Sequence, residues 1–472
     1  MSEAVIVGAG PNGLAFAATL AMRGVRVTVI EAAETIGGGT RTSELTMPGL
    51  LHDDCSAAHP FAVGSAALLP LGLERHGLEW AWAEVDLAHP FDGGEVATMV
   101  RSIDKTVAGL GEAGPAWKRV FGSSSASFEA LGEDIFQPLL HLPRHPFRLM
   151  RFGLPSAMPA TLLARAFPTP QAKALFGGIA AHSFSPLSRP FTSAVAMAMV
   201  CACHTYGWPV ARGGSRAITD AMAAVVLENG GKIETGRAVR SLEELPAADV
   251  VALDLAPGAV AEIAGGRLPS QVSRAYRRYR HGPGAFKVDL AVEGGVPWAD
   301  EASGRAGTVH AAGSFEEIVA AEREVNRGRM PERPFVLVSQ QYLADPSRSK
   351  GGVHPVWAYA HVPHGYRGDA GEAVLDQIER FAPGLRERIL ARSTRSTAEL
   401  GAYNANYVGG DIITGANTVR QTISRPRLAL DPYSTGIPGV FICSAATPPG
   451  AGAHGYCGFN AAQSALRHLS RA

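Results

Sequence analysis

Apolar and polar positions along the first residues follow a strand, helix and strand pattern. A short apolar run, Ala4 to Val7, leads into the turn Gly8-Ala9-Gly10-Pro11-Asn12-Gly13, and a helical stretch extends from there to Met22. A second strand-like run covers residues 26–30 and ends at Glu31. This order predicts a βαβ unit in which the glycine turn connects the first strand to the helix.

Each glycine of the turn has a physical role. Gly8 permits a tight turn, Gly10 lets backbone approach a pyrophosphate, and Gly13 lets the helix pack closely on the strand. The helix N-terminus, at Pro11 and Asn12, offers free N–H groups and a positive dipole end. Glu31, at the end of the second strand, is placed to accept hydrogen bonds from a ribose. The unit therefore predicts a dinucleotide site.

The same glycine pattern recurs near the end of the chain without its context. Gly450-Ala451-Gly452-Ala453-His454-Gly455 follows a strand-like run at 440–443, but Thr447-Pro448-Pro449 lies between them. No acidic residue follows the glycines at the spacing that a ribose contact needs. We expect no second nucleotide site there.

The remaining patterns divide the chain into two interleaved domains. Glycine-rich turns beside strand-like runs occur in 1–70, 209–281 and 405–472, which predicts one discontinuous nucleotide-binding domain. Residues 71–208 contain several helical stretches, and 282–404 contain alternating strand-like runs. These two segments predict an α+β substrate domain in which helices cover a sheet.

Composition excludes several functions. Lys plus Arg and Asp plus Glu are 43 each, so no broad electrostatic field favours nucleic acid as a partner. Five cysteines without a C-x-x-C pair argue against a disulfide framework and a zinc site. The most apolar stretch, 193–203, is well short of the roughly 20 residues needed to span a bilayer and predicts a buried helix. Because the first strand begins at about Ala4, we expect no secretion signal and a cytoplasmic protein.

A family resemblance follows from the order and spacing of several motifs. They are the turn Gly8 to Gly13 with Glu31, Gly37-Gly38 with Thr40-Arg41-Thr42, Gly213-Gly214, Lys287 within 284–289, and the ending 447–462. Together they resemble the FAD-dependent phytoene desaturase-like oxidoreductases. Within that superfamily the chain is most similar to the branch of pyridine nucleotide-disulfide oxidoreductase domain 2 proteins.

The resemblance implies an α/β fold with a Rossmann-type, glutathione reductase-like FAD-binding domain that holds FAD extended. Gly37, Gly38, Thr40 and Arg41 would follow the pyrophosphate and ribityl chain, and Val239 would present backbone to adenine. Ser444 stands where family members often carry a glycine or an acidic residue, and it is expected at the ribityl chain. The terminal loop would lie beside the isoalloxazine, with Gly455, Asn460 and a helix from about Phe459 to Leu469 at its pyrimidine end, where a helix N-terminus stabilises negative charge.

Few side chains are needed for hydride transfer to a flavin. Lys287, His454 and Tyr456 are the catalytic candidates, although a lysine on a strand is more often solvated or paired, and the other two could simply pack the loop. His182 and His204 could line a substrate cavity, although such histidines are more often core residues. His361 and His364 have no convincing third ligand, so we expect no metal site.

The stretch 145–167 interleaves Arg148, Arg151 and Arg165 with apolar residues. Such a pattern can dock on a membrane surface. It can equally form a cap over an apolar pocket or a contact in a homodimer. These alternatives stay open from the sequence.

The leading hypothesis is an FAD-dependent desaturase or dehydrogenase that takes hydride from a C–H bond of a largely apolar small molecule onto flavin N5. Oxygen or a quinone would then accept the electrons. One rival is a flavin amine oxidase-type enzyme, for which an aromatic cage near the flavin is needed. Another is a flavin-bearing binding or assembly protein without turnover.

Overall fold

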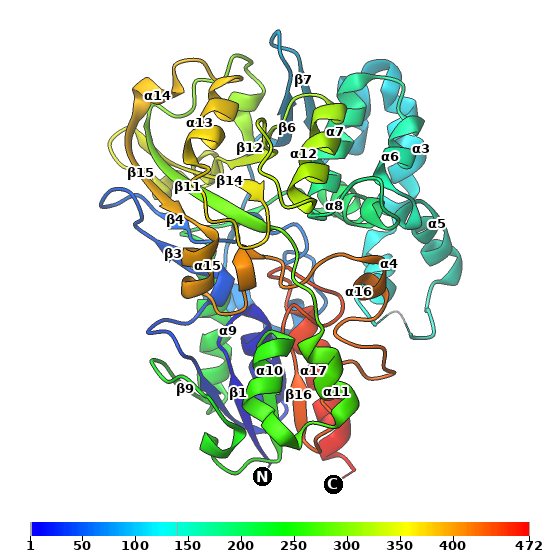
Figure 1. Cartoon of the computed structure of the whole chain (residues 1–472), viewed down its shortest axis with the longest axis vertical. Coiled ribbons are helices and arrows are strands. Elements are labelled where there is room, and N and C mark those ends of the chain that lie inside the picture. Colours follow the sequence, from blue (N-terminus) through cyan, green and yellow to red (C-terminus); the bar gives the residue numbers. More distant parts are fainter. Residues whose placement is uncertain (1, 139, 472) are drawn as a thin grey trace.

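The computed structural model describes residues 2–138 and 140–471, and two sheets organise them (Figure 1). The first is a five-stranded parallel sheet in the order β16-β10-β1-β2-β9. Its strands are β1 (Glu3–Val7), β2 (Arg26–Ile30), β9 (Lys232–Glu234), β10 (Val250–Leu253) and β16 (Val440–Ile442). They come from all three segments that the sequence groups into one nucleotide-binding domain.

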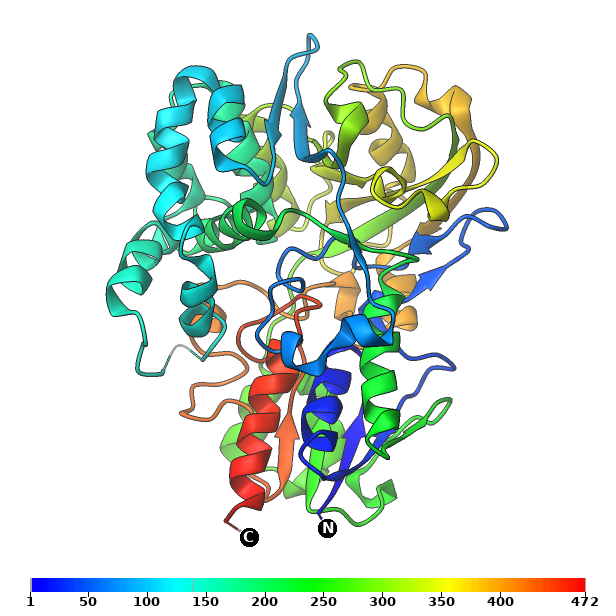
Figure 2. The same cartoon turned by 180° about the vertical axis from the view of Figure 1, so that it is seen from behind.

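Helices cover both faces of this parallel sheet. On one face lie α1 (Pro11–Ala21), α9 (Arg216–Glu228) and α17 (Tyr456–Leu469), which Figure 2 shows in front of the strands. On the other face lie α10 (Pro257–Ala264) and α11 (Ser270–Arg277). Ile6 of β1 packs toward the first group and Val7 toward the second. Burial of both faces explains why these strands are continuously apolar.

Helix α17 begins earlier than the sequence suggests. The expected start was Phe459, whereas the helix begins at Tyr456 directly after Gly455, whose φ is +71°. A residue in the left-handed conformation cannot be part of a right-handed helix. Gly455 therefore ends the preceding loop, and the helix begins at the next residue.

The second sheet is mixed and has seven strands in the order β15-β11-β14-β13-β12-β6-β7. Its strands are β6 (Val85–Pro90), β7 (Val96–Met99), β11 (Gly284–Glu293), β12 (Ala306–Ala311), β13 (Val336–Ser339), β14 (Val353–Val362) and β15 (Ile389–Arg395). Helices α13 (Gly371–Glu379) and α14 (Leu385–Arg388) pack on one face. Trp357 and Tyr359 of β14 project from the opposite face.

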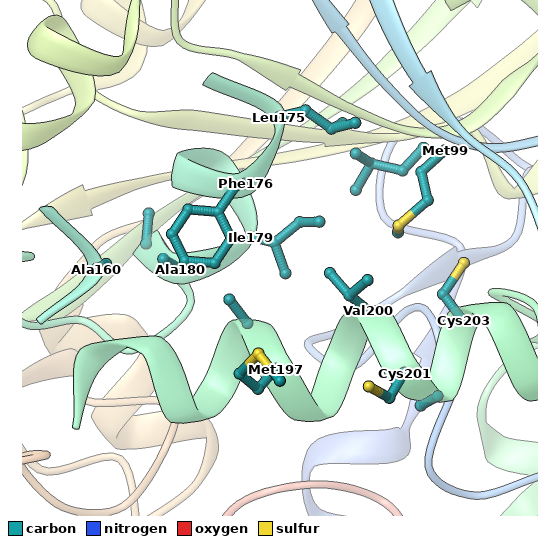
Figure 3. Packing of buried hydrophobic residues seen from close by; sticks show 14 of the residues in the cluster. Met99, Ala160, Leu175, Phe176, Ile179, Ala180, Met197, Val200, Cys201 and Cys203 are labelled. Carbon is teal, nitrogen blue, oxygen red and sulfur yellow. The ribbon is translucent and has the colours of Figure 1, made fainter. Parts of the chain in front are cut away.

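A group of helices packs beside this second sheet. It contains α2 (Ile103–Gly109), α3 (Gly114–Ser125), α4 (Phe128–Ile135), α5 (Pro146–Ala157), α6 (Ala160–Leu163), α7 (Pro170–Ala181), α8 (Thr192–Tyr206) and α12 (Phe315–Asn326). The apolar stretch 193–203 lies in α8, so the predicted buried helix is confirmed. Figure 3 shows Met197 and Val200 of α8 on the side of Phe176 and Ile179 of α7, and Cys203 of α8 opposite Met99. Among the described residues, no helix is both long and apolar enough to cross a bilayer.

Short elements connect the two sheets. The hairpin-like pair β3 (Thr42–Ser43) and β4 (His52–Asp53) and the pair β5 (Trp80–Ala81) and β8 (Val210–Ala211) lie between them, with α15 (Thr397–Tyr403) and α16 (Val419–Ile423). Arg348 is fully buried here, and its guanidinium donates to Asp53 and to the Ala211 carbonyl at 2.6 and 2.7 Å. This ion pair ties the segment after β13 to elements that adjoin the nucleotide-binding sheet.

Candidate active site

A cavity of about 1280 Å³ lies between the two sheets and reaches both of them. Many residues assigned to the cofactor line it: Gly8, Gly10, Pro11, Asn12, Glu31, Gly38, Thr40, Arg41 and Val239. At its other end the wall is made by the helices and by β13 and β14.

At its glycines, the turn presents backbone to the cavity. Gly8 has a φ of +103°, and a Cβ on Gly10 would lie 2.8 Å from Oδ2 of Asp254. Gly38, with a φ of +52°, would place a Cβ 3.0 Å from the Cα of Gly10. Gly13 lies behind the wall, where a Cβ would be 2.1 Å from the carbonyl oxygen of Gly8. The turn thus has the close helix-to-strand packing that a dinucleotide cradle requires.

Glu31 stands at the carboxyl end of β2 and is held by backbone. Its Oε2 accepts a hydrogen bond from Ala9 N at 2.7 Å, and its Oε1 accepts one from Ala33 N at 2.9 Å. Arg41 Nη2 is 3.5 Å from Oε1. Each carboxylate oxygen keeps lone-pair capacity beyond these bonds, so the group can also accept from ribose hydroxyls.

Two polar groups at the cradle have properties that the sequence did not reveal. The buried Oδ1 of Asn12 has no hydrogen-bond partner among the described residues. Asp254, directly after β10, accepts from Gly13 N at 3.0 Å. Burial raises the pKa of Asp254 to about 7, the Gly13 N–H opposes this shift, and the nearby charge of Glu31 adds to it. An acid directly after a buried strand next to β1 was the signal that could have identified it.

Arg41, Gly37 and Val239 lie around the cradle in different ways. Arg41 donates from Nη2 to the Thr35 carbonyl at 2.8 Å, and its guanidinium stands 5.2 Å from the centroid of the Tyr403 ring. Gly37 donates to the Ala9 carbonyl at 2.8 Å and lies outside the cavity wall. Val239 lines the cavity beside Arg237 and Arg240.

The C-terminal loop contributes Ala445 and the run 448–454 to the cavity. Three other residues assigned to the cofactor lie behind this wall. Ser444 is fully buried, Gly455 abuts Leu68 and Ala15, and Asn460 donates from Nδ2 to the Phe136 carbonyl at 2.9 Å. The structure therefore does not place these three residues in the cavity wall, and their cofactor contacts stay predictions.

The three catalytic candidates have different positions. Lys287 is 2% exposed, its ammonium pairs with Asp289, and the cavity is lined by its neighbour Trp357 instead. His454 lines the cavity, and burial lowers its pKa to about 4. Tyr456 lies behind the wall, where its hydroxyl accepts from Ala66 N at 2.9 Å. Of the three, His454 alone contacts the cavity.

The end of the cavity away from the cradle is apolar and aromatic. Its wall includes Phe152, Phe184, Leu337, Trp357 and Tyr359. The Trp357 and Tyr359 ring centroids are 5.1 Å apart with an interplanar angle of 81°. We call this end the chamber.

A histidine pair provides polar atoms at the chamber. His182, at the end of α7, lines the cavity, and its Nε2 is 3.1 Å from Nε2 of His310 on β12. Burial lowers the pKa of His182 to about 3 and also lowers that of His310 well below its usual value. Both imidazoles are therefore neutral at physiological pH, and one Nε2 donates to the other.

The other sequence-derived histidines have partners within the protein. His204 accepts from Nε1 of Trp117 at 3.0 Å, and His361 Nδ1 is 2.5 Å from Oε1 of Glu322. His204 is therefore a packed core residue, whereas His182 takes the cavity position. Within residues 2–138 and 140–471, no group of His, Cys, Asp or Glu side chains is arranged to hold a metal ion.

Comparisons with known proteins match the nucleotide-binding segment and the whole chain. A family model described as NAD(P)-binding Rossmann-like domain matches residues 6–68. The pyridine nucleotide-disulfide oxidoreductase domain-containing protein 2 of Rattus norvegicus is 22% identical over 552 aligned positions, which cover 99% of this chain and 94% of that protein. The protein of the same name from Mus musculus is 27% identical over 156 positions and 30% of this chain.

Solved structures of similar shape cover nearly the full length. An oxidoreductase from Methanosarcina mazei has a TM-score of 0.67 at 15% identity, covering 98% of this chain and 100% of that one. A putrescine oxidase variant has a TM-score of 0.63 at 17% identity, covering 100% and 99%. The cyclohexylamine oxidase of Brevibacterium oxydans has a TM-score of 0.58 at 15% identity, with the same coverage.

These likenesses confirm the predicted fold class. The chain has a mixed α/β fold with a Rossmann-like dinucleotide-binding domain, and its fold matches those of putrescine oxidase and cyclohexylamine oxidase over its whole length. The matched family model describes a dinucleotide-binding domain, in agreement with the cradle, and the similar proteins are named as oxidoreductases or oxidases.

Proposed function

We propose that the protein is an FAD-dependent oxidoreductase that removes hydride from a C–H bond of a largely apolar small molecule. One observation carries this proposal: a single cavity joins the dinucleotide cradle to an apolar chamber whose wall includes His182. The bound FAD supplies a two-electron acceptor. The protein supplies position, exclusion of water and a route for the proton.

The cradle residues fit FAD. Gly10 and Gly38 line the cavity and pack so closely that a Cβ on either would collide with its neighbours in the cradle, and the N-terminus of α1 faces the same space. The unpartnered Oδ1 of Asn12 and the carboxylate of Glu31 provide acceptors for hydroxyl groups. We assign the adenine end to Val239 and the flavin end to the loop 448–454.

The chamber suits an apolar substrate. Phe184, Trp357 and Tyr359 provide flat apolar surfaces that orient a chain or ring and exclude water. Removal of hydride from one carbon leaves a positive charge, and loss of a proton from the neighbouring atom completes the double bond. We assign His182, which lines the chamber as a neutral base, as the acceptor of that proton. We assign His310 as the residue that positions the His182 imidazole.

The resemblance to phytoene desaturase-like proteins favours a desaturation, in which the substrate gains a carbon–carbon double bond. A second candidate, oxidation of an amine, is favoured by the perpendicular rings of Trp357 and Tyr359 in the chamber and by the likeness to putrescine oxidase and cyclohexylamine oxidase. In that reaction the carbon next to nitrogen gives up hydride and the nitrogen loses the proton.

Anaerobic mixing of the FAD-loaded protein with candidate substrates tests the proposal. We expect an apolar substrate with a removable hydride to bleach the visible flavin band. Bleaching by amines alone, with release of hydrogen peroxide in air, would decide for the amine oxidase. Stable FAD without bleaching by any apolar compound or amine would instead favour a binding or assembly protein.

A further inference from the structure

A row of exposed apolar side chains lies on the outer face of α5. Phe147, Met150 and Leu154 are 82%, 57% and 68% exposed. Their spacing of three and four residues places them on one side of the helix. The opposite side of the same helix carries Phe152, which is buried and lines the cavity. Helix α5 is therefore apolar both toward the cavity and toward the surroundings.

A second exposed apolar segment lies beside it, at α16 and the residues that follow. Ile423, Leu428 and Leu430 are 46%, 70% and 87% exposed. Figures 1 and 2 both place this segment near α5, which lies at the outer edge of the molecule. Ile423 and Ala157 are exposed and also line the cavity, so the cavity reaches the surface between α5 and α16.

These two segments carry basic side chains without any acidic ones. The whole chain has equal numbers of basic and acidic residues, yet no Asp or Glu occurs between residues 135 and 219 or between 412 and 430. Arg148 and Arg151 are exposed and border the apolar row of α5, and Arg420 is exposed on α16. Basic side chains flanking exposed apolar ones are typical of segments that bind anionic lipid surfaces.

We propose that the surface formed by residues 140–162 and 419–430, the docking surface, binds an anionic lipid bilayer. The cavity then opens toward the acyl chains, so that an apolar molecule dissolved in lipid enters the chamber without crossing water. This inference goes beyond the proposed reaction, because a lipid-facing entrance can serve either candidate substrate class.

The charge pattern favours lipid over a second copy of the chain. A two-fold interface would place this surface against itself, so arginines would face arginines with no acidic residue in either segment to compensate. Like charges across an interface are unfavourable. An anionic membrane instead complements the arginines and accommodates the exposed phenylalanine, methionine and leucine side chains.

Sedimentation of the FAD-loaded full chain with lipid vesicles tests the proposal. We expect binding to vesicles of phosphatidylcholine mixed with phosphatidylserine, weaker binding to phosphatidylcholine alone, and release by salt. The double variant Phe147→Glu, Leu154→Glu is expected to lower the partition constant by about 100-fold, because it removes two apolar side chains from the lipid contact and places two negative charges against an anionic surface. Arg148→Ala with Arg151→Ala should lower it by a similar factor on mixed vesicles only.

Leu227→Glu is the matched control. Leu227 is 55% exposed on α9, in the nucleotide-binding part of the molecule, and its variant should bind vesicles like the parent. Failure of the parent to bind mixed vesicles would overturn the proposal, as would equal loss in the control. A dimer in size-exclusion chromatography that the α5 variants dissociate would also overturn it. Vesicle binding requires no turnover, so its failure is distinguishable from failure of the proposed reaction.

Discussion

The two ends of the cavity are built in different ways. At the cradle the wall is backbone, set by glycines within one βαβ unit and by one acid after each of two parallel strands. At the chamber the wall is side chains, and residues far apart in sequence, such as His182, Leu337 and Tyr359, meet there. The backbone therefore fixes the shape of the cradle, whereas single side-chain substitutions can reshape the chamber.

The two ends also differ in charge. The cradle gathers free N–H groups, the carboxylate of Glu31 and the guanidinium of Arg41. The chamber is lined by aromatic rings and by the neutral imidazole of His182, which His310 contacts from behind the wall. A charged cofactor segment and an apolar substrate are thus bound at opposite ends, and variants at each end should affect different measurements.

The strongest test of this difference is Gly13→Ala at the cradle. The new Cβ would lie 2.1 Å from the Gly8 carbonyl oxygen, a backbone atom that cannot move aside without shifting β1 or α1. When FAD is absent the variant turn can shift to relieve this overpacking, and FAD binding then has to restore the strained turn at a cost of about 3 kcal/mol, so we expect about 100-fold weaker FAD binding in a fluorescence titration. Gly258→Ala is the control, because its Cβ would meet nothing within 4 Å. A fully flavinated Gly13→Ala protein would show that the cradle tolerates side chains.

The same distinction explains what could be predicted from the sequence. The βαβ unit, Glu31 and the discontinuous parallel sheet were accessible because a turn of fixed geometry requires glycine at fixed spacing. The pairing of His182 with His310 was not accessible, because α7 meets β12 only through tertiary packing. Lys287 and Tyr456 were proposed as catalytic from their place in motifs, but Asp289 and Ala66 N bind their polar atoms behind the wall. Sequence patterns predict helices, strands and turns, but they do not predict the hydrogen-bond or ion-pair partner of a buried polar side chain.

At the chamber, His182→Gln should slow flavin reduction by about 100-fold, because loss of a positioned base removes a contribution of that order. Its FAD content should equal that of the parent. The pKa of His182 is lowered to about 3, and the base acts in its neutral form, which persists above that value. Protonation of His182 should therefore not slow flavin reduction, measured by stopped flow, when the pH is lowered to about 5.

His76→Gln is the control for this variant, because His76 pairs with Glu228 in the nucleotide-binding part of the molecule. Rates within a factor of two of the parent are expected for it. If His182→Gln reduced its flavin as fast as the parent, another group would have to accept the proton.

Asp254 provides a smaller, pH-dependent test of the cradle. Its pKa is raised to about 7, so the carboxyl is largely protonated below that pH and negative above it. A negative carboxylate beside a pyrophosphate disfavours binding, so FAD binding takes up a proton. We expect the FAD dissociation constant to increase above pH 7 by at most about tenfold per pH unit.

Asp254→Asn should remove this dependence between pH 6 and pH 9, since an amide at the same position carries no charge. Its affinity above pH 7 should exceed that of the parent. An unchanged slope in the variant would assign the pH dependence to another group of the cradle.

The smallest effect is expected from Tyr456→Phe. Its hydroxyl accepts one hydrogen bond from Ala66 N, and its ring stacks on Phe136 at a centroid distance of 4.5 Å. The variant keeps the stacking and leaves one N–H without its acceptor, which costs about 1 kcal/mol in the free energy of unfolding, measured by denaturant titration. Because the side chain lies behind the cavity wall, the rate of flavin reduction should change by less than a factor of about three, a barrier change below about 0.7 kcal/mol. A rate loss as large as that of His182→Gln would instead indicate that Tyr456 of the C-terminal loop takes part in the reaction, as the sequence predicts. The chamber would then only bind the substrate.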